Sequence, residues 1–398
     1  MAGTTRIRWI DVAKGIAILS ILLHHIPFVR EDGSSVLGPY VALYDVCLFY
    51  VTAGFFLSTR KPLAQFVLDR TRRLMVPYAV TCLAMGVFIL ALKFMHGSIC
   101  PPTIWHSRTE FLLAALFGAG VPFPSLPEGA GYIGAIWFLE AMLVALIEVR
   151  ILMQITPKHP ALGFVSTIVL ALCAVTLRRK LYVPFNVEQG LAAAPFLYGG
   201  WYYRRLGRLE ATVHPALLLP LLIVAAVAGY YGMRPSFVTP SFNGGVLGLI
   251  GGLSATLFVI HLSKILDHHT PRIARVLEFY GNNSLIVLCV HLAMLNCGAN
   301  YLVAKMLGFF WQGVPANVVS AGHIALQLVV SAVVATVLAR RRRGKVESRR
   351  AEGERSHAQR EPRHAKTEPL HADDEPPRAP NAPKHLKANP RHAKPGLG

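Results

Sequence analysis

The stretch that decides the fold is RWIDVAKGIAILSILLHH, residues 8–25. Most of its side chains are apolar, and its length is close to the roughly 20 residues that a helix needs to cross the hydrocarbon layer of a bilayer. It nevertheless carries Asp11, Lys14, His24 and His25. Ionisable groups inside a spanning helix are costly and point by default to function. We therefore expect a membrane-spanning helix that carries chemistry.

The composition of the whole chain agrees with a membrane protein. Of 398 residues, 53% are hydrophobic and only 15% are charged, with a formal net charge of +19. A soluble domain has about 25% charged residues, so an ordinary soluble enzyme is excluded. We expect an all-α, polytopic membrane protein with about ten spanning helices. The apolar runs that predict them are 9–28, 38–58, 74–95, 132–149, 161–177, 189–203, 212–231, 243–263, 282–304 and 317–339.

Two parts of the chain differ sharply in composition. Residues 1–339 hold the apolar runs, whereas residues 340–398 form a basic tail in which His and Pro recur every seven residues. A proline in every unit is incompatible with a coiled coil, so we expect this tail to be disordered. It is either a plain solvated extension or a segment that binds anionic lipid headgroups or a metal.

Charge and cysteine placement constrain orientation and cofactors. The expected loops on the same side of the membrane as the N-terminus contain more Lys and Arg than the loops on the other side. Because such loops are usually cytoplasmic, both termini are predicted to be cytoplasmic. The six cysteines form no C-x-x-C pair. We therefore expect neither a disulfide framework nor a metal site.

The spacing inside residues 8–25 is suited to catalysis. Lys14 and His25 are eleven residues apart, about three helical turns, which places them on one face roughly 16 Å apart. Asp11 can pair with Lys14 at i, i+3. The cation can hold an anionic carrier while the imidazole accepts a proton from a hydroxyl. Alternatively, Lys14 snorkels to the surface beside Asp11 and the histidines are satisfied by other helices.

This stretch resembles the opening motif of the acyltransferase-3 superfamily, bacterial integral membrane O-acyltransferases, and most nearly its fucose 4-O-acetylase-like branch. The motif has a basic residue, ten intervening residues and a histidine, which Lys14 and His25 match. His24 stands where that branch usually has glycine. Register favours His25 as the acting histidine over His24.

Later segments resemble the family in the same order. They are Phe49–Phe56 (FYVTAGFF), Arg70–Tyr78 (RTRRLMVPY), Ile136–Leu139 (IWFL), Ala194–Gly200 (APFLYGG), and Gly281–Leu285 (GNNSL) followed by His291.

The resemblance implies transfer of an acyl group, acetyl in the first instance, from cytoplasmic acyl-CoA to a hydroxyl of a sugar or glycan. His25 would be the general base, with Lys14 and Asp11 in the same site. Arg70, Arg72 and Arg73, expected in an inner loop, would hold the CoA phosphates; ordinary positive-inside charge explains them equally well. Transfer is either direct or through an acyl-histidine.

The expected location is the bacterial inner membrane, with acyl-CoA, the glycan acceptor and the lipid bilayer as partners. Neither a nucleic acid nor a metal is expected. A transporter or flippase for a glycan or small polar solute is the competing class, in which intramembrane charges such as Asp45 and Glu140 would relay protons or bind substrate. A scaffold acting through the basic tail would leave the charged first helix unexplained.

Overall fold

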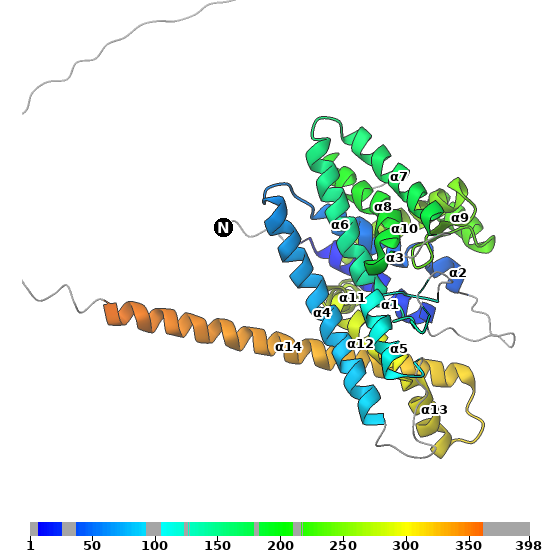
Figure 1. Ribbon diagram of the computed structural model, residues 1–398, viewed down its shortest axis with the longest axis vertical. Coiled ribbons are helices and arrows are strands. Elements are labelled where there is room, and N and C mark those ends of the chain that lie inside the picture. Colours follow the sequence, from blue (N-terminus) through cyan, green and yellow to red (C-terminus); the bar gives the residue numbers. More distant parts are fainter. Residues whose placement is uncertain are drawn as a thin grey trace, which may run out of the picture. The chain divides into compact units, whose positions relative to one another are not determined.

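The structure is a computed structural model of the chain. It describes residues 7–25, 37–92, 105–122, 126, 128–178, 183–209, 216 and 218–360, except for the side chains at 24, 25, 92, 300 and 342–360. Most of this is helical (Figure 1). The α-helices are α1 (Arg8–His25), α2 (Gly38–Val41), α3 (Asp45–Phe55), α4 (Leu63–Leu92), α5 (Arg108–Phe117), α6 (Trp137–Ile155), α7 (Pro160–Leu177), α8 (Val187–Arg205), α9 (Leu218–Tyr230), α10 (Val246–His269), α11 (Pro271–Asn282), α12 (Ser284–Asn296), α13 (Ala299–Phe310) and α14 (Ala316–Arg360).

Two small elements accompany these helices. A 3-10 turn, η1 (Pro184–Asn186), leads into α8, and strands β1 (Pro235–Ser236) and β2 (Ser241–Phe242) form an antiparallel pair before α10. The described chain is therefore predominantly helical, as its composition predicts.

Several helices have the length and composition of membrane spans. Within the described residues, four are long and apolar enough: α4, α7, α10 and α14. The pair α11 and α12, bent by 70°, makes a fifth if it counts as one span. Charged residues keep α1 and α6 out of this set, because each holds three of them. The expected count of ten spans is not confirmed.

Helix α1 lies inside the bundle and packs against α3, α10 and α11. Its residues Val12, Ala13, Ala17 and Ile18 are completely buried. Helices α6, α7 and α8 pack side by side around another part of the core (Figure 1). The helix with the most unusual charges is thus enclosed by protein, where such charges can find partners.

Glycines allow α1 to cross α11 at backbone contact. A Cβ atom built on Gly15 would lie 2.0 Å from the Leu277 carbonyl oxygen, and one built on Gly281 would lie 1.8 Å from the Asp11 carbonyl oxygen. Only glycine permits such an approach. The crossing fixes the turn of α1 that carries Asp11.

Several arginines lie at one end of the bundle. We call this end the basic end and define it by Arg8, Arg60, Arg150 and Arg205. Ring contacts show that its helices meet there: the ring centroid of Phe55 lies 6.0 Å from that of Trp9 and 6.0 Å from that of Tyr203. The start of α1, the end of α3 and the end of α8 therefore lie together.

The chain divides into two compact units, Met1–Ala339 and Arg340–Gly398. The backbone is helical through Arg360, whereas the disorder expected for residues 340–398 stays a prediction. Residues 340–360 are rich in Arg, Ala and Glu, which favour helix, and the first proline of the tail is Pro362. The rest of the predicted disordered tail, 361–398, lies outside the described residues.

Candidate active site

The charged pair of α1 forms as its spacing predicts. Lys14 Nζ lies 2.6 Å from Asp11 Oδ1. The Asp11 side chain is 7% exposed and that of Lys14 is 25% exposed. A buried carboxylate is costly without a cation, so Lys14 stabilises Asp11. Its own partial exposure leaves room for an anion to approach from the open side.

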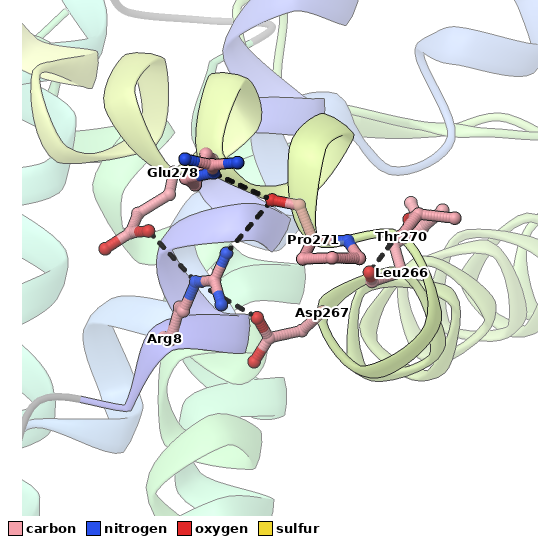
Figure 2. A network of polar contacts seen from close by, with 7 residues as sticks. Arg8, Leu266, Asp267, Thr270, Pro271 and Glu278 are labelled. Atoms are coloured by element: carbon pink, nitrogen blue, oxygen red, sulfur yellow. Dashed lines mark hydrogen bonds and ion pairs between the residues drawn. The ribbon is translucent and has the colours of Figure 1, made fainter.

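The start of α1 is held by a second charged network. Figure 2 shows the Arg8 guanidinium between the carboxylates of Glu278 and Asp267. Arg8 Nε lies 3.0 Å from Glu278 Oε2 and 3.2 Å from Asp267 Oδ1, while Nη2 donates to the Pro271 carbonyl oxygen at 3.4 Å. One arginine thus joins α1 to the end of α10 and to α11. Together with the glycine crossing, it fixes both position and rotation of the turn that carries Lys14.

Helix α1 continues without a break from Arg8 to His25. Lys14 and His25 therefore sit in one helix, and eleven residues correspond to about three turns and roughly 16 Å along its axis. The imidazoles of His24 and His25 lie outside the described residues. Their assignment as base stays a prediction.

The three predicted donor-binding arginines do not lie in a loop. Helix α4 begins at Leu63, directly after Pro62, so Arg70, Arg72 and Arg73 fall within its early turns. No proline interrupts the segment before Pro77, which explains why the helix starts earlier than the expected span at residue 74. Their placement in a loop was wrong, whereas their expected position on the inner side of the membrane stays a prediction.

Helical geometry also separates these arginines. Arg70 and Arg73 are three residues apart and share a face, whereas Arg72 points to another side. The Arg70 guanidinium carbon lies 5.2 Å from the ring centroid of Phe66, and that of Arg150 lies 5.8 Å from the same centroid. The structure therefore brings Arg70 together with Arg150 around Phe66, an association that the sequence did not suggest.

Glu140 is held by an amide rather than by a cation. Asn186 Nδ2 donates to Glu140 Oε2 at 2.7 Å and to the Gly118 carbonyl oxygen at 2.7 Å. Asn186 and the preceding Phe185 have positive φ angles of 53° and 64°, which non-glycine residues rarely adopt. Such strain persists only where surrounding contacts impose it. This polar cluster joins α5, α6 and the start of α8.

His291 belongs to a buried chain of polar groups between α12 and α14. Its Nδ1 lies 2.9 Å from Gln327 Oε1, and Gln327 Nε2 lies 2.9 Å from His323 Nε2. All three side chains are completely buried. Since the amide oxygen only accepts, this arrangement places a proton on His291 Nδ1. The i, i+4 spacing of His323 and Gln327 in α14 was the sequence signal for this chain, but it gave no hint of the partner helix.

Asp45, at the start of α3, is buried, and its Oδ1 accepts a hydrogen bond from the Val46 backbone N–H at 2.6 Å. Among the residues that the structure describes, no three His, Cys, Asp or Glu side chains are grouped so that they could hold a metal ion.

A helical bundle with apolar spans and with charged groups held in its interior defines an integral membrane protein. The acyltransferase domain of the acyltransferase-3 family matches residues 7–340. The chain therefore belongs to the acyltransferase-3 family, and this supports a membrane acyltransferase. No curated protein and no solved structure gives a significant match.

Proposed function

We propose that the protein is an O-acyltransferase that moves an acyl group, acetyl in the first instance, from cytoplasmic acyl-CoA to a hydroxyl of a sugar or glycan. The observation that carries the proposal is the Asp11–Lys14 pair, 2.6 Å apart, in a buried helix that continues to His25. Family membership over residues 7–340 supports the reaction class. The sugar acceptor rests on the likeness to the fucose 4-O-acetylase-like branch.

The donor would enter at the basic end, and the excess of arginine there supports assigning this end to the cytoplasmic side. Lys14 would attract the anionic donor while Asp11 holds its ammonium group in place. Arg70 is half-buried and would contribute a guanidinium for a CoA phosphate. Arg72 and Arg73 are exposed and would add a longer-range attraction.

His25 would act at the opposite end of α1, so the acceptor would arrive from the periplasmic side of a bacterial inner membrane. The acceptor oxygen attacks the thioester carbonyl carbon while the imidazole takes its proton. The carbon–sulfur bond then breaks, an ester forms, and the CoA thiolate recovers the proton from the imidazolium. The roughly 16 Å between Lys14 and His25 would be spanned by the arm that carries the thioester.

Thioester consumption by purified protein in detergent tests this proposal. The protein is incubated with acetyl-CoA and extracted cell-envelope glycans, and wild type is compared with His25→Ala, His24→Ala and a tail deletion after Arg343. We expect only His25→Ala to lose transfer while its melting curve is retained. If no preparation consumes or binds acetyl-CoA, the proposal is wrong, and proton-coupled solute uptake in liposomes then tests the transporter class.

A further inference from the structure

A groove of ≈ 300 Å³ opens at the basic end, apart from the Asp11–Lys14 pair. Three chain segments form it: the turn after α3, the end of α6 and the end of α8. Its lining includes Ser58, Thr59, Arg60, Trp201 and Arg205. No acidic residue lies among the described residues that line it. The groove thus offers hydroxyl and guanidinium donors without a carboxylate to compete for them.

The two lining arginines are available to a ligand. Both Arg60 and Arg205 are exposed, and the Arg205 guanidinium carbon lies 5.4 Å from the ring centroid of Trp201. The neighbouring Arg204 instead donates to the Phe55 carbonyl oxygen. Adjacent arginines of α8 therefore have different tasks: one ties α8 to α3 and the other lines the groove.

A third arginine lies buried behind the turn that lines the groove. Arg150 is 0% exposed, and its Nη2 donates to the carbonyl oxygens of Thr59 at 3.3 Å and Lys61 at 2.8 Å. Its Nε and Nη1 have no hydrogen-bond partner among the described residues. No ion pair to Arg150 is present among the described residues. Burying a guanidinium charge in this way is costly unless an anion lies nearby.

Arg150 also prepares the turn for an anion. The two carbonyl oxygens that it binds point toward its guanidinium, so they are not presented to the groove, where they would repel a negative group. Arginine forks match the geometry of phosphate oxygens and bind them in pairs. Buried and exposed positive charge therefore act together at one small, hydroxyl-lined groove.

We propose that this groove is a phosphate-binding subsite, with Arg60 and Arg205 as ligand-contacting residues and Arg150 as the positioning residue behind them. The inference rests on the proposed function in one respect: a CoA thioester would bring its nucleotide phosphates to this end. The headgroup of an anionic phospholipid would bring the same chemical group. The experiment separates these two sources.

Binding is measured on full-length protein in uncharged detergent, with coenzyme A by titration calorimetry and with phosphatidylglycerol against phosphatidylcholine by native mass spectrometry. The variants are Arg60→Gln, Arg205→Gln and the double variant. Arg208→Gln is the matched control, because Arg208 is an exposed arginine three residues beyond Arg205 and outside the groove. Melting curves establish that each variant is folded.

For coenzyme A as ligand, we expect Kd to rise about tenfold in each single variant, which is the loss expected for one charge-assisted hydrogen bond. The control should remain within twofold of wild type. If wild type binds no coenzyme A but retains phosphatidylglycerol through Arg60 and Arg205, the subsite stands and the proposed donor fails. If acyl transfer proceeds and no variant changes the binding of either probe, the subsite is overturned while the proposed function stands.

Discussion

Replacing Gly281 by Ala tests how strictly the α1–α11 crossing determines the site. The new Cβ atom would lie 1.8 Å from the carbonyl oxygen of Asp11 and 2.7 Å from the backbone nitrogen of Gly15. Non-bonded carbon and oxygen atoms need more than 3 Å, so the two backbones must separate by more than about 1 Å. Neither obstructing atom belongs to a side chain that could rotate away.

The expected cost is at the upper end of the range for overpacking, about 3 kcal/mol. An unfolding entropy of about 2.1 cal/mol/K per residue corresponds to roughly 1.2 °C for each kcal/mol in a chain of 398 residues. The apparent melting temperature in detergent should therefore fall by about 4 °C. Scans are run at one fixed rate, because membrane proteins of this size commonly unfold irreversibly. Displacing the Asp11 turn should also reduce thioester consumption, since Lys14 moves with it.

Gly308→Ala is the matched control. Gly308 lies within α13, and no atom approaches within 4 Å of the Cβ atom that alanine would add. Alanine favours helix over glycine by up to about 1 kcal/mol, so this variant should melt at the wild-type temperature or slightly above it. Equal melting temperatures for Gly281→Ala and Gly308→Ala would refute the close crossing.

Variants at three further sites, Arg8, Lys14 and Gln327, test the polar contacts of the bundle by melting curves and thioester consumption. Arg8→Gln removes the cation shared by the carboxylates of Asp267 and Glu278. Because Arg8 is partly exposed, we expect stability to fall by only about 1 kcal/mol, and adding Glu278→Gln should recover part of that loss. Unchanged stability in Arg8→Gln would contradict a stabilising role for these ion pairs. Lys14→Met should abolish transfer and lower stability, because it removes the cation that the buried Asp11 carboxylate contacts. Lys14→Arg should keep both, and Lys14→Met with Asp11→Asn should recover stability alone. Transfer by Lys14→Met would count against a donor-binding cation. Gln327→Leu leaves two buried histidines without their shared amide and should cost about 2 kcal/mol; an unchanged melting temperature would show that this chain of hydrogen bonds contributes little.

Local features of the fold were predictable from residue order. The first helix was expected at 9–28 and is observed at Arg8–His25, because a continuous apolar stretch of this length is itself enough to predict a helix. The Asp11–Lys14 pair follows from i, i+3 spacing in any helix. The start of α4 was misplaced by eleven residues, since Arg70–Arg73 were taken for a loop although nothing in their backbone chemistry stops a helix.

Contacts between distant segments were beyond such reasoning. Arg8 could have pointed to lipid headgroups, yet it lies between Asp267 and Glu278, some 260 residues further along the chain. Arg150 is completely buried behind the turn that follows α3, although that turn lies about 90 residues earlier in the chain.

Residue order is therefore sufficient for the helical class and for the charge pair within α1, because each depends on side chains no more than a few turns apart. Three other features depend on which helices become neighbours: the close α1–α11 crossing, the ion pairs of Arg8, and the groove in front of Arg150. That choice is made by the packing of all the helices at once, in which glycine positions decide how closely two backbones approach.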